Sequence, residues 1–199
     1  MCRSQPAVGG QRTHGTASES RRPRSQTGSA DSVYFISHGL ANPDGHGFSI
    51  GPTLVQPKST GHIALRTADP SDPPVIQPNY LTAEEDWTTL LAGFKLGREI
   101  AAAPAFDAYR GDEFLPGSQV TSDDEIREFI RNHIETLYHP VGTCKMGDDP
   151  LAVVDAQLRV RGIQGLRVAD ASIMPTIINA NTNAPSMMIG AKAARMIRQ

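Results

Sequence analysis

The stretch YHPVGTCKMG, residues 138–147, joins a helical region of the sequence to an extended one. Pro140 disfavours helical geometry at the residue before it, so the preceding helix is expected to end near Tyr138. His139 then lies at the junction, close to two glycines that loosen the backbone. Imidazole exchanges protons near neutral pH, which makes His139 a candidate general base. A lone histidine is more often structural, and by residue type alone that alternative is favoured.

Three helices are predicted around this stretch. A Thr-x-x-Glu capping box at residues 82–85 opens an amphipathic helix that stops at Pro104. A Ser-x-x-Glu box at residues 122–125 opens the helix that precedes the histidine. The last helix is expected to start around Pro185, a residue suited to the first helical turn, and to run through Ile197.

Short β-type runs occupy the remaining sequence. Alternating apolar and polar residues over 61–67 are typical of a half-buried strand. The other candidate strands are residues 33–36, 48–56, 158–160 and 166–170. The expected fold class is therefore α+β, with an antiparallel sheet covered by helices.

Composition excludes several classes of function. The 199 residues carry a net charge of −2 without a basic stripe, so no nucleic-acid partner is predicted. No apolar run approaches the roughly 20 residues of a transmembrane helix, so no membrane span is expected. The two cysteines, Cys2 and Cys144, do not suggest a disulfide scaffold, and a cytoplasmic location is predicted. Residues 1–31 contain few large apolar side chains and are expected to be a disordered extension.

Amide side chains gather in residues 179–185, just before the last helix. A helix amino terminus offers unpaired N–H groups and a partial positive field, both suited to an anionic or carbonyl oxygen. The alternative is simple helix capping by Asn183, which residue type alone favours.

Three segments together resemble the carboxy-terminal signature of the glucose-methanol-choline (GMC) oxidoreductases, in both order and spacing. They are the histidine segment (residues 138–147), the aspartate segment (166–175) and the asparagine segment (181–190). The resemblance is closest to the choline dehydrogenase-like branch and covers most of residues 32–199. It implies hydride transfer from the carbon of a small-molecule alcohol to N5 of FAD.

The same resemblance implies a division of the chain. Residues 32–165 would form the substrate-binding domain. Residues 166–199 would belong with a Rossmann-like FAD domain. No G-x-G-x-x-G dinucleotide turn is present, so that domain is expected to be absent from the chain. The alternatives to a flavoenzyme active by itself are therefore an inactive fragment, or a split-enzyme subunit that needs a separate flavin-binding domain or subunit.

The resemblance also implies roles for particular residues. His139 falls on the family's active-site base, which takes the hydroxyl proton of the alcohol. Asn181 falls on the second member of that pair, which is His or Asn in different branches, and an amide can donate to the developing alkoxide. The FAD-contacting positions are matched by Asp170 and Ala171 near the ribityl and diphosphate region, and by Thr182 and Asn183 beside the flavin ring.

Two rival sites carry less weight. Residues 47–51 fit the G-x-S-x-G pattern of serine hydrolases, with Ser49 as nucleophile, but that motif needs a helix directly after the serine, and extended chain is expected here. The spacing of His133, His139 and Cys144 fits no common zinc pattern, so no metal is predicted. His133 is expected to be a packed core histidine on the apolar helix face.

Overall fold

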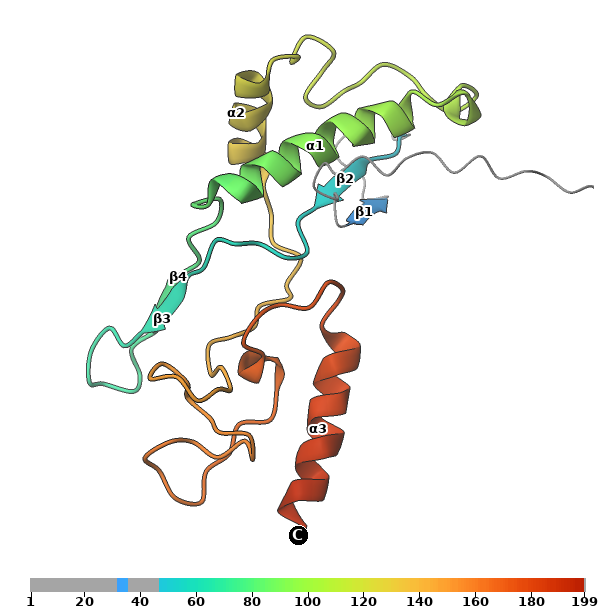
Figure 1. Ribbon diagram of the computed structural model, residues 1–199. Helices are drawn as coiled ribbons and strands as arrows, with labels where there is room; N and C mark the ends of the chain where they lie inside the picture. The colour runs from blue at the N-terminus through green and yellow to red at the C-terminus, as the bar shows by residue number, and fades with distance from the viewer. Residues whose placement is uncertain (1–31, 36–46, 199) are drawn as a thin grey trace, which may run out of the picture.

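The computed structural model describes residues 32–35 and 47–198, in a mixed α+β arrangement (Figure 1). The predicted disordered extension, residues 1–31, lies outside the described residues. The helices are α1 (Glu84–Ala101), α2 (Asp123–His133) and α3 (Asn183–Ile197), with short 3-10 helices η1 (Pro104–Phe106) and η2 (Ala171–Ile173). The strands are β1 (Ser32–Phe35), β2 (Ile50–Thr53), β3 (His62–Ala64) and β4 (Val75–Gln77).

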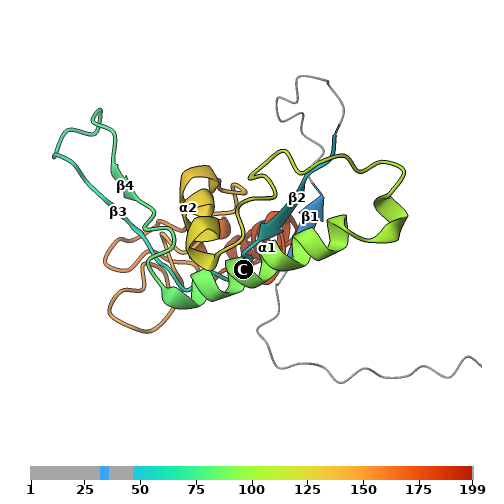
Figure 2. The same cartoon turned by 90° about the horizontal axis from the view of Figure 1, so that it is seen from above.

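The strands form two separate antiparallel ribbons, β1–β2 and β3–β4, and not the single sheet that the sequence predicted. Within the described residues, neither ribbon gains a third strand. Helix α1 packs along β2, so only the first ribbon is covered by a helix (Figure 2). Pro52 lies inside β2 opposite Val33, which a two-stranded ribbon tolerates because each strand keeps a free edge.

The β3–β4 ribbon projects from the molecule, and the prediction of a half-buried strand at residues 61–67 was wrong (Figures 1 and 2). All seven of these residues are exposed. Ile63 and Ile76 face each other in the ladder and still expose 51% and 65% of their surface. Alternation of residue types correctly predicted extended chain, but burial needs a neighbouring element that the described residues do not supply.

Two hydrophobic cores organise the chain. The first joins α1 to α2 through Trp87, Leu90, Leu91, Ile126 and Ile130. The second packs α3 against loops and η2 through Val154, Leu158, Ile173, Met174, Ile189 and Ala193. An Arg127–Glu84 ion pair adds to the first core, where the same guanidinium lies over the ring of Trp87. The predicted domain boundary at 165/166 stays a prediction.

Helix α1 starts differently from its predicted capping box. Ala83 occupies the N-cap position, and the hydroxyl of Thr82 donates to the carbonyl of Asn79. The Ala83 N–H is bonded instead by the hydroxyl of Ser59, at 3.0 Å. A residue 24 positions earlier in the chain thus supplies an oxygen where the sequence pattern expected a local one.

Helix α2 confirms its capping box but ends earlier than predicted. The Ser122 hydroxyl accepts from the Glu125 N–H, and the Glu125 carboxylate accepts from the Ser122 N–H at 2.9 Å. The helix stops at His133, because Ile134 adopts an extended backbone with ψ of 134°. His133 is exposed and stacks on Phe129 at 4.3 Å between ring centroids, so its assignment to the core was wrong.

Residues 158–160 and 166–170 pair with each other, although too briefly to form strands. A single antiparallel bridge joins Arg159 to Arg167. The N–H of Val160 donates to the Leu166 carbonyl at 3.0 Å, and the N–H of Val168 to the Leu158 carbonyl at 3.1 Å. The predicted strands are therefore the two arms of a loop.

Candidate functional site

The histidine segment follows an extended connection that leads from the first core to the second. Tyr138 takes a left-handed backbone with φ of 60°, which is uncommon for a bulky side chain. Its N–H donates to the hydroxyl of Thr136, and its ring is 80% exposed. This change of direction comes directly before His139, which is half-buried.

A hydrogen bond joins the histidine segment to the asparagine segment. Nδ1 of His139 lies 2.9 Å from the Thr182 hydroxyl oxygen, and the two residues are 43 positions apart. Thr182 is buried and is the N-cap residue of α3, yet its side chain makes no capping bond. The helix begins at Asn183, two residues before the expected Pro185, so capping by Asn183 is excluded.

The aspartate segment lies alongside the histidine segment. The N–H of Cys144 donates to the Ser172 carbonyl at 3.0 Å, and that of Met146 to the Ile173 carbonyl at 2.8 Å. These bonds, with the His139–Thr182 contact, bring all three signature segments together around the amino-terminal end of α3.

The remaining predicted site residues border this junction. Asp170 is the N-cap of η2, and its carboxylate accepts from the N–H of Ser172 at 2.8 Å and from the same residue's hydroxyl. Ala171 is half-buried beside the second core. Asn181 and Asn183 are exposed on either side of the buried Thr182.

The surface of α3 is partly apolar and open. Met187, Met188 and Ile197 expose 64%, 56% and 64% of their surface. Ile189 and Met196, by contrast, turn inward to the second core. Figure 1 shows α3 at the edge of the molecule, with one side uncovered.

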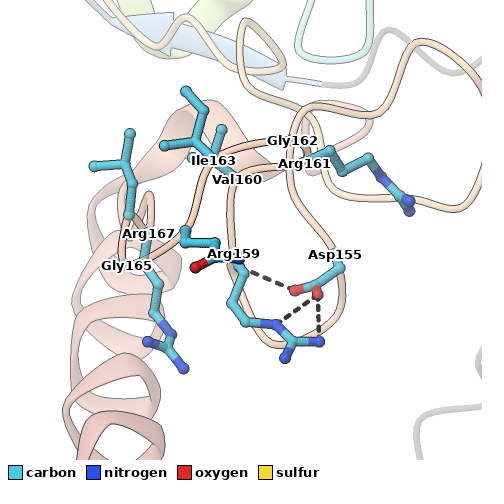
Figure 3. A pocket seen from close by; sticks show the side chains of 10 residues that line it. Asp155, Arg159, Val160, Arg161, Gly162, Ile163, Gly165 and Arg167 are labelled. Carbon is cyan, nitrogen blue, oxygen red and sulfur yellow. Dashed lines mark hydrogen bonds and ion pairs between the residues drawn. The ribbon is translucent and has the colours of Figure 1, made fainter.

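A hollow lies in the loop of residues 155–167 (Figure 3). Three arginines border it, but two have protein partners inside the loop. Arg159 pairs with Asp155 at 2.7 Å, and Nε of Arg167 donates to the Gln157 carbonyl at 3.1 Å. None of the predicted site residues lines this hollow.

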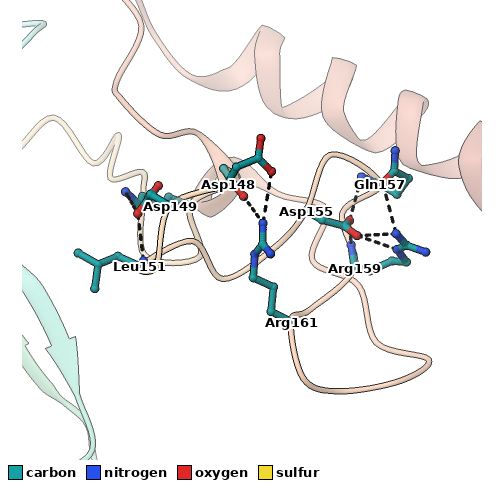
Figure 4. A network of polar contacts seen from close by, with 9 residues as sticks. Asp148, Asp149, Leu151, Asp155, Gln157, Arg159 and Arg161 are labelled. Atoms are coloured by element: carbon teal, nitrogen blue, oxygen red, sulfur yellow. Dashed lines mark hydrogen bonds and ion pairs between the residues drawn. The ribbon is translucent and has the colours of Figure 1, made fainter.

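A polar network holds the same loop against the end of the histidine segment (Figure 4). Arg161 donates to the Gly147 carbonyl, and Lys145 pairs with Asp149 at 2.9 Å. The hydrogen bond from Lys145 lowers the pKa of Asp149, and the one from Arg159 lowers the pKa of Asp155. These contacts are structural and fix the loop that flanks the site.

The rival sites are not supported by the described structure. Ser49 is followed by strand β2, whereas a nucleophile elbow needs a helix at that point. No group of three potential metal-binding side chains gathers among residues 32–35 and 47–198. Every helix in that part of the chain is too short or too polar to span a bilayer.

The histidine, aspartate and asparagine segments, which hydrogen bonds bring together, are those of one family of oxidoreductases. Residues 57–190 match the carboxy-terminal profile of the GMC oxidoreductases, and the chain belongs to this family. It is 49% identical over 165 residues to an alcohol dehydrogenase [acceptor] of Pseudomonas putida, and 51% identical over 158 residues to the oxygen-dependent choline dehydrogenase of Brucella ovis. These matches cover 83% and 78% of the chain but only 30% and 29% of the relatives.

Solved structures give the same relationship. Pyridoxine 4-oxidase from Mesorbium loti aligns with a TM-score of 0.67 and 35% identity, over 71% of this chain and 28% of that one. A fungal aryl-alcohol oxidase aligns with a TM-score of 0.66 and 33% identity, over 75% and 24%. The chain thus spans less than a third of the length of the relatives it matches.

Proposed function

We propose that this chain supplies the alcohol-binding part of a FAD-dependent oxidoreductase that converts an alcohol to an aldehyde. The observation that carries the proposal is the His139–Thr182 hydrogen bond, since it joins the two segments that would hold the proton acceptor and its amide partner. FAD, when bound, supplies the hydride acceptor. The protein's own task is to position the alcohol and to accept its hydroxyl proton.

His139 is the proposed base. Thr182 occupies Nδ1, so Nε2 is the ring nitrogen left to face an alcohol. Removal of the hydroxyl proton makes the adjacent carbon a good hydride donor, because the developing alkoxide gives electron density to the C–H bond that breaks. The proton passes to Nε2, the hydride leaves with its electron pair, and the alcohol becomes an aldehyde.

Asn181 is the proposed partner of that base. It directly precedes Thr182, whose side chain contacts His139, and it is exposed at the surface that the alcohol would approach. An amide N–H can donate to the alkoxide oxygen as negative charge develops. Its effect is expected to be smaller than that of the base, because it stabilises charge without accepting the proton.

The residues at the junction suit one face of FAD. The first N–H groups of α3 and the exposed amides of Asn181 and Asn183 are donors suited to flavin carbonyl oxygens. Asp170 and Ala171 form the adjacent border and are proposed to face the ribityl and diphosphate region. Thr182 is proposed to lie beside the ring. Among the described residues these groups line an open surface, so the opposite wall would come from a separate flavin-binding domain or subunit.

A split-enzyme subunit is therefore the second candidate function. The uncovered apolar side chains of Met187 and Met188, which are neighbours on α3, support it, because exposed apolar surface is costly to leave in water. An inactive fragment is the remaining outcome.

The visible absorption spectrum tests these alternatives. The full chain would be incubated with FAD, alone and with the part of the Pseudomonas putida relative that lies outside the match, and then treated with primary alcohols and choline. Retained flavin that is bleached by an alcohol supports the proposed function. Retention only with the added partner identifies a split subunit, and no retention in either case leaves an inactive fragment.

A further inference from the structure

Thr182 holds an unusual position for a helix N-cap residue. It is 7% exposed, and threonine at this position normally accepts a backbone N–H of the first helical turn. Here no such side-chain bond is made, and the hydroxyl oxygen lies 2.9 Å from Nδ1 of His139. The Thr182 carbonyl accepts the Ser186 N–H at 3.0 Å, which is the ordinary first bond of the helix. The hydroxyl lies toward the histidine.

We infer that Thr182 is a positioning residue that selects the tautomer of His139. A hydroxyl can donate or accept; in the assigned arrangement its oxygen accepts from Nδ1–H, which leaves the lone pair of the neutral ring on Nε2. In a neutral imidazole one nitrogen carries the proton and the other the lone pair, and the partner of one nitrogen decides which. This inference rests on the proposed function, because only the Nδ1–H form can accept an alcohol proton at Nε2.

The packing around the contact holds the two side chains in position. The Thr182 hydroxyl can rotate to present a lone pair, whereas its oxygen is fixed by a buried backbone at the start of α3. His139 is fixed from the other side by Pro140, and the left-handed turn at Tyr138 directs the chain into it. Both partners are therefore held by separate parts of the second half of the chain.

The tautomer can be read directly from the full chain labelled with ring-15N histidine. Nitrogen NMR at about pH 8, where imidazole is neutral, distinguishes a protonated from an unprotonated ring nitrogen. The six histidines are resolved by comparison with a His139→Gln spectrum. We expect Nδ1 of His139 to be the protonated nitrogen and Nε2 the unprotonated one. An Nε2–H ring in the unmodified chain would overturn the inference.

Two variants separate the effect of the Thr182 hydroxyl group from the effect of the side chain's branched shape. Thr182→Val keeps the branched side chain but removes the acceptor, so the ring is expected to move toward the Nε2–H form that imidazole prefers in water. Thr182→Ser keeps the hydroxyl and should retain the Nδ1–H form. A Thr182→Val spectrum identical to that of the unmodified chain would contradict the role. If Thr182→Val does not fold, the unmodified and Thr182→Ser spectra still decide the question.

The NMR measurement of the His139 tautomer does not depend on whether the chain oxidises an alcohol. If the ring is Nδ1–H and responds to Thr182→Val, but His139→Gln leaves turnover of the reconstituted complex unchanged, the proposed function fails and the tautomer assignment stands. If His139→Gln abolishes turnover while Thr182→Val leaves both ring and rate unchanged, the assignment fails and the function stands. With both correct, Thr182→Val should lower kcat by about 10- to 100-fold with little change in KM, and Thr182→Ser should restore it.

Discussion

The buried carboxylate of Asp86 accepts a hydrogen bond from the backbone N–H of Ser59 at 2.9 Å and a second from the Ser59 hydroxyl. The N–H of Lys58 is a third donor, at 2.7 Å. The same Ser59 hydroxyl receives the N–H of Ala83. The Asp86 side chain, in the first turn of α1, therefore anchors the extended segment that contains Ser59, 27 residues earlier in the chain.

Replacing Asp86 by Ala is expected to destabilise the first core. Three donors lose their acceptor, and a hydrogen bond to a charged group contributes about 1.5–3 kcal/mol. Lys58 is exposed and Ser59 half-buried, so water can replace part of the lost bonding and the total loss is smaller than three full bonds. We expect a loss of about 3 kcal/mol in the free energy of unfolding, measured by urea denaturation. Glu85→Ala removes an exposed carboxylate from the same helical turn and is the matched control, with an expected loss of about 0.5 kcal/mol. Equal losses for the two variants would contradict the anchoring role.

The capping box of α2 is expected to contribute a pH-dependent stability. Hydrogen bonds from the backbone and side chain of Ser122, followed by the Thr121 N–H, lower the pKa of Glu125 in the folded chain. A lowered folded pKa means that this contribution is complete above the ordinary glutamate value and is lost as the pH falls through the folded value.

Thermal unfolding of the Glu125→Gln variant checks this sign. The variant should unfold at a lower temperature than the unmodified chain at neutral pH, and the difference should shrink as the pH falls below the ordinary glutamate pKa. Glu99→Gln makes the same change of charge on an exposed position of α1 and controls for general charge effects. A difference that grows on acidification would be opposite to the expected sign.

Two glycines are expected to respond in opposite directions to alanine. A Cβ at Gly61 would lie 2.1 Å from the Gln77 carbonyl oxygen and 2.6 Å from that of Pro78, so the backbone at the base of the β3–β4 ribbon must move apart. We expect Gly61→Ala to cost about 1–3 kcal/mol. Gly190 lies in α3 with open space around its Cβ position, and Gly190→Ala should stabilise the chain by about 0.5–1 kcal/mol. Urea denaturation measures both changes, and a stable Gly61→Ala variant would show that the ribbon opens easily.

His139→Gln is expected to remove turnover from a reconstituted flavin complex while flavin stays bound. Loss of a positioned general base reduces the rate by about 100- to 10,000-fold, which can be followed as the initial rate of flavin bleaching by an alcohol. His133→Gln is the matched control, because that ring stacks on Phe129 in α2 and lies outside the signature junction. Asn181→Ala should slow the reaction less. Full activity of His139→Gln would remove His139 from the mechanism.

Local sequence patterns determined where regular structure forms. The Ser122–Glu125 box was confirmed because both partners lie within one turn of the helix they cap. Helix α3 and the extended chain after Ser49 were likewise predicted, and the three signature segments identified the GMC family before any contact was known. Such features depend on residues that are near neighbours in the chain.

The tertiary structure alone decided how those pieces meet. The Ser59 hydroxyl accepts the N–H of Ala83 at the start of α1, and the Thr182 hydroxyl contacts His139 at the start of α3, although neither pair is close in sequence. The exposed β3–β4 ribbon has the alternation of a buried strand but no covering element among the described residues. Periodicity records which side chains could be buried, whereas burial and long-range hydrogen bonds depend on which surfaces the folded chain brings together.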